Sequence, residues 1–267
     1  MDLRTATLIH RELRENRLVE IYDQGEVRSL YFGGRFLQSS LSLSTPHLLE
    51  LSYTHYMMFP LMFKTSLEHV LVIGLGAGSL VHFLHHHFPN CLIDAVDHSS
   101  HVIDLARGYF RLPENRKVHI YCEDGFKFLS GHPETRSYDL ILVDAFDENG
   151  MSTDIYAEPF FRLCADALRP DGVFCCNLWS GNSTNISDIQ DELGRCFSAR
   201  YFLPVPDRGN LICTAVQFEL QWRIFFRNRG ELQQLQRRFK FDFSRVTEVA
   251  KRNNLSLAER LLHIFTG

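Results

Sequence analysis

Long apolar runs are missing from this 267-residue chain. No stretch approaches the roughly 18 consecutive apolar residues that a membrane-spanning helix needs. The N-terminal segment, residues 1–18, also lacks an apolar stretch of the length typical of a secretory signal peptide. We therefore expect a protein that has no membrane partner.

Paired cysteines are missing as well. The seven cysteines are odd in number, include no C-x-x-C pair and lie mostly in apolar runs. Free thiols in a reducing compartment fit this pattern, so the sequence favours a cytoplasmic location. Three consecutive histidines, His85 to His87, resemble a metal-binding tract, but consecutive residues of a helix point in different directions. We expect no metal ion there or elsewhere.

A strong excess of either charge is also absent. The formal net charge is −4, hydrophobic residues make up 45% of the chain and charged residues 22%. This composition is ordinary for a soluble globular protein. Because a mildly acidic chain gives no electrostatic reason to bind a polyanion, we expect no nucleic-acid partner.

The most informative stretch runs from His69 to Asp97. An apolar run ends at a glycine-rich turn with Gly74, Gly76 and Gly78, and a helical pattern and a second apolar run follow. Glycines let a backbone turn sharply and approach a ligand closely, because they carry no Cβ. The acid at the tip of the next strand, Asp97, stands where it can accept hydrogen bonds from a ribose diol.

This order of strand, glycine turn, helix, strand and acid favours a nucleoside ligand, although a tight turn without a ligand can look the same in sequence. The spacing is G-x-G-x-G followed by Ser79, which departs from the G-x-G-x-x-G of dinucleotide-binding folds. No lysine follows the glycines as in a P-loop, so a nucleoside triphosphate is not expected.

Strands and helices alternate from residue 69 to about residue 217, which predicts a parallel sheet covered on both faces. The last two strands are joined by a short turn at 206–209 and should pair antiparallel. We expect an α/β fold with a Rossmann-like seven-stranded, mostly parallel sheet and helices on both faces, preceded by a small N-terminal β-hairpin domain. The expected strands are 70–73, 92–96, 118–121, 140–143, 173–178, 201–205 and 211–216.

Two domains follow from this pattern. Residues 1–45 contain short alternating segments separated by glycine turns, which predict the N-terminal β-hairpin domain. Residues 46–267 form the Rossmann-like catalytic domain with C-terminal helices. Thr45 and Pro46 match the cap and first residue of a helix over 47–63. The C-terminal helices are expected over 229–238, 243–252 and 256–265.

Acids follow successive strands at the edge where open α/β sheets bind ligands. Asp124 precedes a helix and is either its N-cap or an acceptor for an adenine amino group. Asp144 and Asp147 follow an apolar strand, either as an Asx-turn or as a pair of carboxylates at a reaction centre. In the second case one carboxylate holds a cationic amine and the other accepts its proton, because a protonated amine cannot attack. Asn177 also lies near a strand tip.

Together these residues resemble the spermidine synthase family, the polyamine aminopropyltransferases, which have the class I S-adenosylmethionine-dependent methyltransferase fold. The segment DAFDENGMSTDIY, residues 144–156, resembles the family pattern D[ST]SDPxGPAxxL[YF] without a gap. The segments EPFF, which begins at Glu158, and GGRFLQS, residues 33–39, resemble the family's next helix start and its LDGxxQ hairpin. The resemblance covers essentially the whole chain.

The resemblance implies a role for individual residues. Asp147 would be the proton-accepting catalytic carboxylate and Asp144 a second one on the co-substrate side. It also implies decarboxylated S-adenosylmethionine or S-adenosylmethionine as co-substrate, a small-molecule amine such as putrescine as acceptor, and a homodimer. The residues implied to bind the co-substrate are Gln38, Gly74, Gly76, Gly78, Asp97, Asp124 and Gly125, and those implied to bind the amine are Tyr53 and Tyr156.

The chain departs from the family in both pockets. Ala77 in GLGAGS stands where the family's GGGDGG has an aspartate that binds the amine of decarboxylated S-adenosylmethionine. Ser52-Tyr53-Thr54 replaces YHE, and Glu148 replaces the proline of SDP. Each lost acid removes charge-assisted hydrogen bonds of ~1.5–3 kcal/mol. We predict a spermidine synthase-like aminopropyltransferase, with an S-adenosylmethionine-dependent methyltransferase or a non-catalytic adenosyl-ligand-binding relative as alternatives.

Overall fold

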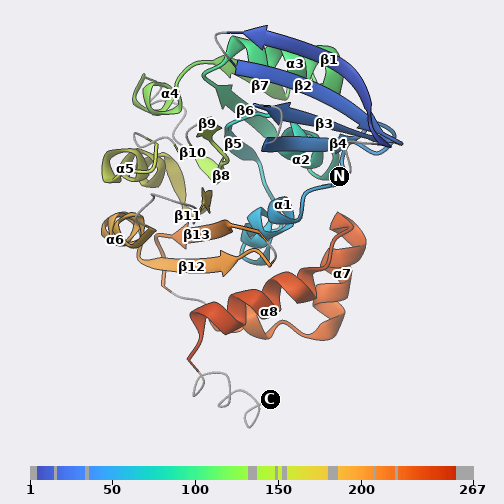
Figure 1. Ribbon diagram of the computed structural model, residues 1–267. Coiled ribbons are helices and arrows are strands. Elements are labelled where there is room, and N and C mark those ends of the chain that lie inside the picture. The colour runs from blue at the N-terminus through green and yellow to red at the C-terminus, as the bar shows by residue number, and fades with distance from the viewer. Residues whose placement is uncertain are drawn as a thin grey trace.

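The computed structural model describes residues 5–14, 17–33, 36–131, 137–147, 150–151, 155–179, 186–206, 208–219 and 222–256. Figure 1 shows a central sheet with helices on either side and a smaller sheet formed by the N-terminal strands. One sheet has seven strands and the N-terminal sheet has four. The fold class predicted from the sequence is therefore confirmed.

The N-terminal sheet is antiparallel, in the order β1-β2-β3-β4. The sequence predicted its last three strands but missed the first. That strand is exposed along most of its length, so its apolar residues give no regular alternation. A domain boundary at residue 45 stays a prediction. The strands are β1 (Thr7–Arg14), β2 (Arg17–Gln24), β3 (Val27–Phe32) and β4 (Phe36–Ser42).

The large sheet has the strand order β12-β13-β11-β8-β5-β6-β7. Only β13 runs against its two neighbours, and the remaining pairs are parallel, as the short turn before β13 predicts. Two short strands, β9 (Phe146–Asp147) and β10 (Gly150–Met151), form a hairpin after β8. The seven strands are β5 (His69–Ile73), β6 (Leu92–Asp97), β7 (Val118–Cys122), β8 (Tyr138–Val143), β11 (Leu168–Trp179), β12 (Ala199–Pro204) and β13 (Asn210–Val216).

Helices cover both faces because strand residues alternate between two apolar cores. In β5, Val70 and Val72 belong to one core, whereas Leu71 and Ile73 belong to the other. Figure 1 shows α4, α5 and α6 on the opposite side of the sheet from α1 and α2. The helices are α1 (Ser52–Met57), α2 (Ser79–His87), α3 (Ser100–Phe110), α4 (Gly125–Gly131), α5 (Glu158–Ala167), α6 (Ile186–Cys196), α7 (Arg229–Phe239) and α8 (Phe243–Asn254).

The helix predicted over 47–63 is wrong in extent. Only α1 and a following 3-10 helix, Phe59–Met62, are present. Pro60 prevents α1 from continuing, because a proline lacks the N–H that a helix needs and its ring clashes with the preceding turn. Residues 46–51 form turns and bends instead of a first helical turn.

At the C-terminal end, α7 and α8 confirm two of the three predicted helices, and nearly all of the third, 256–265, lies outside the described residues. None of the helices in the described ranges is long and apolar enough to span a bilayer.

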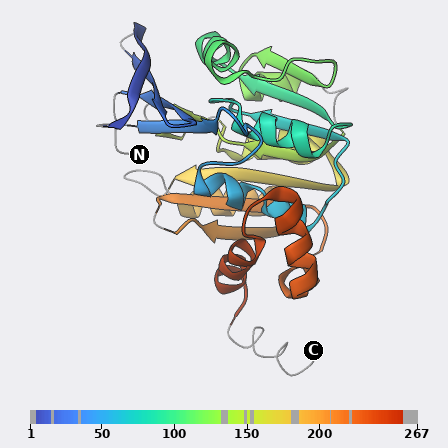
Figure 2. The same ribbon diagram turned by 90° about the vertical axis from the view of Figure 1, so that its right-hand side faces the viewer.

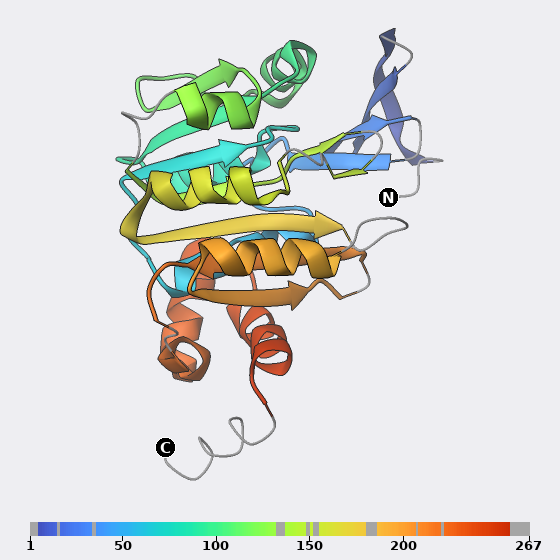
Figure 3. The same cartoon turned by 90° about the vertical axis from the view of Figure 1, so that its left-hand side faces the viewer.

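The N-terminal sheet lies at the carboxyl edge of the large sheet, beside the loops that follow its strands (Figures 2 and 3). Gly76, in the loop after β5, comes so close to Ser39 that a Cβ on Gly76 would lie 3.3 Å from the Ser39 Cβ. Arg28 of β3 donates to the carbonyl oxygen of Tyr109 in α3 (2.8 Å) and to both carboxylate oxygens of Asp23 (2.7 Å each). The N-terminal sheet therefore forms one wall of this edge.

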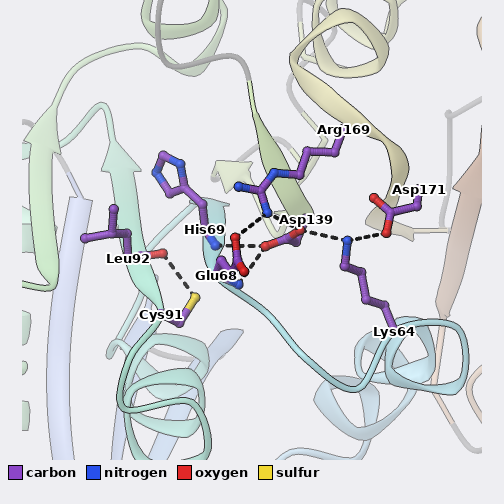
Figure 4. A network of polar contacts seen from close by, with 8 residues as sticks. All are labelled: Lys64, Glu68, His69, Cys91, Leu92, Asp139, Arg169 and Asp171. Atoms are coloured by element: carbon purple, nitrogen blue, oxygen red, sulfur yellow. Dashed lines mark hydrogen bonds and ion pairs between the residues drawn. The ribbon is translucent and has the colours of Figure 1, made fainter.

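The opposite edge is joined by a buried carboxylate, Asp139 of β8 (Figure 4). Its Oδ2 accepts hydrogen bonds from the backbone N–H groups of Glu68 (2.6 Å) and His69 (3.0 Å). Its Oδ1 lies 2.8 Å from Lys64 Nζ and 2.8 Å from a guanidinium nitrogen of Arg169. The network ties the segment before β5 to β8 and β11, away from the edge that carries the candidate site.

Candidate active site

The glycine turn after β5 packs directly on the loop after β8. Gly74 has φ +92°, a conformation that side chains with a Cβ rarely adopt. A Cβ on Gly74 would clash with the carbonyl oxygen of Asp144. The N–H of Asp144 donates in turn to the carbonyl oxygen of Ile73 (2.8 Å). The predicted nucleoside loop and the predicted catalytic loop therefore share one edge of the sheet.

The rest of the glycine turn faces the N-terminal sheet and begins α2. Gly76 contacts Ser39, the residue after Gln38. Gln38 is the extra residue of a β-bulge, because its neighbours Leu37 and Ser39 pair with adjacent residues of β3. Gly78, with φ +76°, is the N-cap of α2. The bulge thus lies next to the turn, which brings Gln38 to the candidate site.

Asp97 ends β6, and its carboxylate is held by backbone groups. Oδ2 accepts from the N–H of Leu75 in the glycine turn (2.9 Å), and Oδ1 accepts from the N–H of Ser99 (2.9 Å). The residue is only 9% exposed. Because a carboxylate has about four acceptor positions, these two bonds set its orientation without defining its full capacity.

Asp124 and Gly125 have structural roles at the start of α4. Asp124 Oδ1 accepts from the N–H of Lys127 (3.0 Å), so the N-cap alternative left open by the sequence is present. A Cβ on Gly125 would lie 2.7 Å from a methyl carbon of Ile73, so the glycine lets α4 pack closely on β5. Their contact with an adenine stays a prediction.

The carboxylate of Asp144 is held by side chains from two other elements. Tyr53 of α1 donates its hydroxyl to Oδ2 (2.9 Å), and Asn177 of β11 donates its Nδ2 to Oδ1 (2.9 Å). Asn210 of β13 donates its Nδ2 to Oδ1 of Asn177 (3.0 Å). The hydroxyl of Tyr156 donates to the backbone oxygen of Asn177 (2.9 Å). The structure therefore brings three predicted site residues, Tyr53, Asp144 and Tyr156, into one cluster.

Asn210 is the member of this cluster that the sequence did not indicate. Asn177 lies near a strand tip, but Asn210 follows a turn and matches no motif. In the antiparallel pair of β11 and β13, Asn177 lies opposite Ile212, and Trp179 lies opposite Asn210. The two asparagines are diagonal neighbours, which share one face of a sheet. Only the register of this pair could have revealed the contact.

Burial changes the acid–base chemistry of the cluster. Burial raises the pKa of Asp144 above its ordinary value, although the hydrogen bonds from Asn177 and Tyr53 lower it in part. Burial and the neighbouring Asp144 carboxylate also raise the pKa of the Tyr53 hydroxyl well above its ordinary value, and the exposed Arg208 opposes this effect. Tyr53 is therefore a neutral hydrogen-bond donor, and the charge of Asp144 depends on its two donors.

Asp147 lies in β9, three residues after Asp144, and its backbone pairs with Gly150 of β10. The hairpin therefore begins next to the cluster. The side chain of Asp147 lies outside the described part of the structure, so its role as the proton acceptor stays a prediction.

Ala77 is fully buried and belongs to the core that contains α2 and α3. At the position where the resembling family has an aspartate, this glycine turn therefore brings no charge to a ligand.

The histidines 85–87 act as packing groups where their rings have contacts. The ring of His86 stacks on that of His47, with centroids 3.7 Å apart. The ring of His87 packs on Phe83 and Phe239. Across the described ranges, no three histidine, cysteine, aspartate or glutamate side chains are grouped as a metal ion would require.

Comparisons with known proteins agree with this geometry. A family model described as the spermine/spermidine synthase domain matches residues 50–222. The polyamine aminopropyltransferase of Chromobacterium violaceum is 35% identical over 252 residues, which cover 91% of this chain and 93% of that protein. A probable spermidine synthase from Corynebacterium glutamicum has a similar fold, with a TM-score of 0.70 at 19% identity over 93% of this chain and 94% of that one. A spermidine synthase in complex with the transition-state analogue AdoDATO gives a TM-score of 0.69 at 16% identity, over 96% of this chain and 88% of that one. This chain belongs to the spermine/spermidine synthase family.

Proposed function

We propose that this protein is a transferase that moves an aminopropyl group from decarboxylated S-adenosylmethionine to a small amine. The observation that carries the proposal is the shared edge at which Gly74 packs on Asp144, with Asp97 at the adjacent strand tip. The family match and the identity to a polyamine aminopropyltransferase support the same reaction.

The nucleoside side of the site is assigned to the glycine turn and Asp97. Asp97 is held by Leu75 and Ser99 at the position where ribose hydroxyls are bound in related sheets. Gly74, Gly76 and Gly78 allow a ligand to approach the backbone, because no Cβ projects from the turn. We carry contacts of Gln38, Asp124 and Gly125 with the nucleoside over from the family resemblance.

The acceptor side is assigned to the two carboxylates after β8. The nitrogen lone pair of the amine attacks the propyl carbon next to the sulfonium, a C–N bond forms, and the C–S bond breaks. Its electron pair goes to sulfur, which leaves as neutral methylthioadenosine. We assign binding of the ammonium to Asp144, with Tyr53 and Tyr156 lining the pocket, and removal of its proton to Asp147. Alignment of the two reactants and one general base are enough for this reaction.

S-adenosylmethionine as the co-substrate is the second candidate, and buried Ala77 is the observation that favours it. Intact S-adenosylmethionine carries a carboxylate that an aspartate at this position would repel. The neutral methyl of Ala77 does not. The product would then be a methylated acceptor.

Calorimetry and product mass distinguish these reactions. Decarboxylated S-adenosylmethionine, S-adenosylmethionine and methylthioadenosine are titrated separately into the protein. The protein is then incubated with putrescine and each co-substrate. We expect the mass of an aminopropyl group to be added to an amine. Addition of a methyl group would instead establish the second candidate, and tight binding with no product from any amine would indicate a ligand-binding relative.

We also propose a homodimer that forms through the N-terminal sheet. Leu8, Ile9 and Leu13 of β1 are 43%, 39% and 69% exposed, and Phe36 of β4 is 67% exposed. Large apolar side chains grouped on an exposed sheet mark a contact surface. Light scattering at micromolar concentration should give a dimer. Leu13→Glu should shift it toward monomer, whereas Gln233→Glu on α7, which adds the same charge, should not.

A cytoplasmic location fits the cysteines. All seven are free thiols, and Cys175 and Cys176 are buried next to each other in β11. Free thiols persist in reducing compartments. Fractionation of cells that express the full chain tests this location.

A further inference from the structure

Asn177 and Asn210 form a relay of side-chain hydrogen bonds that ends on Asp144. We propose that these two asparagines are positioning residues, which hold the Asp144 carboxylate in the orientation that binds the ammonium of the acceptor. The inference rests on the proposed function, because it names the residues that prepare the acceptor side of that reaction.

Hydrogen-bond chemistry gives the relay a direction. An ionised carboxylate only accepts, so Asn177 must turn its NH2 group toward Asp144. The amide oxygen of Asn177 then faces Asn210, which must present its own NH2 group, 3.0 Å away. Without that donor, Asn177 is free to reverse its amide and place an oxygen against the carboxylate. Asn210 therefore controls the charge environment of a group that it does not touch.

The backbone around the relay leaves the amide as the movable part. Asn177 is 2% exposed and lies in the middle of the ladder between β11 and β13. Its backbone oxygen accepts from the hydroxyl of Tyr156, so the peptide group is held as well. The other oxygen of Asp144 is bound by Tyr53 from α1. Only the orientation of the Asn177 amide is left to its side-chain partners.

The relay offsets the cost of a buried charge. Burial raises the pKa of Asp144, and the donors Asn177 and Tyr53 act against this rise. A reversed Asn177 amide would replace one attractive contact with a repulsive one. Asp144 would then bind a proton at higher pH, and a neutral carboxyl group attracts an ammonium far less than a carboxylate does.

Substitutions at Asn210 test the relay. Asn210→Asp keeps the size of the side chain but only accepts, so it draws the NH2 group of Asn177 away from Asp144. Asn210→Ala removes the donor without adding a charge, and Asn210→Ser restores a hydroxyl donor. Asn253→Asp, at an exposed position of α8, controls for the added charge.

The measurement is a titration of the side-chain carboxyl carbon of Asp144 by 13C NMR in ligand-free protein, with the resonance assigned by its loss in Asp144→Asn. In Asn210→Ala we expect the midpoint to rise by about one pH unit, the scale of one charge-assisted hydrogen bond. It should rise further in Asn210→Asp, return toward the unmodified value in Asn210→Ser and stay unchanged in Asn253→Asp.

Acceptor and nucleoside binding give the second readout. At neutral pH the KM for the acceptor amine should rise roughly tenfold in Asn210→Asp, as one pH unit of titration implies. The affinity for methylthioadenosine should stay within about twofold, because its assigned contacts are on the other side of Gly74.

Three outcomes would overturn the relay. They are a midpoint that moves only in Asn210→Asp, a midpoint that moves in neither variant, and a loss of methylthioadenosine affinity that parallels the shift. The first would show that only the new charge acts, and the last would show that Asn210 merely supports the fold. Because the titration needs no turnover, absence of an amine product from the unmodified protein would count against the proposed function alone.

Discussion

Gly74 lies against the peptide group that joins Asp144 to Ala145, with no room for a side chain. A Cβ on Gly74 would lie 2.6 Å from the carbonyl carbon of Asp144 and 3.1 Å from the amide nitrogen of Ala145. Gly74 belongs to the turn assigned to the nucleoside, and Asp144 belongs to the loop assigned to the amine. The contact therefore sets the distance between the two halves of the site.

Gly74→Ala should destabilise the protein and disturb both halves. The backbone at φ +92° is unfavourable for alanine, and the new methyl group must displace the Asp144 peptide. We expect a loss of at least ~2–3 kcal/mol in the free energy of unfolding, measured in urea. Gly108→Ala is the control, because nothing lies within 4 Å of its Cβ position in α3. It should be neutral or stabilise by about 0.5–1 kcal/mol. Equal stability of the two variants would contradict the packing described here.

Asp97→Asn should weaken nucleoside binding while the fold persists. The amide oxygen of asparagine can still accept from Leu75 or Ser99, but the charge that strengthens a bond from a ribose hydroxyl is gone. We expect the binding free energy of methylthioadenosine to fall by roughly 1.5–3 kcal/mol in calorimetry. Asp104→Asn, at an exposed position of α3, should have no effect. Unchanged affinity in a folded Asp97→Asn protein would remove Asp97 from the site.

Asp139 should make stability depend on pH at the acid end. Burial acts to raise the pKa of Asp139, but hydrogen bonds from Lys64, the backbone of Glu68 and His69, and Arg169 outweigh it, so the net pKa is lowered. A lowered carboxyl pKa contributes stability above the unfolded pKa of about 3.9, and this is lost as the pH falls through the lower folded value.

Asp139→Asn should therefore cost about 3 kcal/mol of unfolding free energy at pH 7, the lower end of the range for breaking a buried ion pair. The difference from the unmodified protein should shrink as the pH falls below 4 in urea denaturation experiments. Asp171→Asn is the control, because Asp171 contacts Lys64 but has a side chain that is 70% exposed. It should cost less than about 1 kcal/mol. A pH-independent difference for Asp139→Asn would contradict the shift.

The fold could be predicted because its signals are local. The run from Val70 to Ile73 is apolar on both faces, which marks a strand buried between two layers of helices. The strand tips at Asp97 and Asp144 followed from the same pattern, since parallel strands end at one edge. Local signals were weaker in β1, which is mostly exposed, and in α1, where Pro60 ends a longer apolar helical pattern.

The site could be predicted only in part, because contacts across the sheet depend on register. The bond from Asn210 to Asn177 exists because β11 and β13 pair with Trp179 opposite Asn210. A shift of one residue would turn Asn210 to the other face. Asp124 shows the complementary difficulty, since a helix cap and a ligand contact call for the same side chain at the same place.

Asp147→Asn tests the assignment of the two carboxylates after β8. If Asp147 accepts the proton of the attacking amine, the variant should bind methylthioadenosine with nearly unchanged affinity. Its turnover with a verified amine should fall by about 10²–10⁴-fold, the usual range for loss of a general base. Asp144→Asn should instead raise the KM for the amine, because the carboxylate that attracts the ammonium is lost. Raising the pH should partly restore Asp147→Asn, since more of the amine is then already deprotonated. Full activity of Asp147→Asn at neutral pH would exclude it as the base and leave Asp144 as the carboxylate that both binds and deprotonates the acceptor.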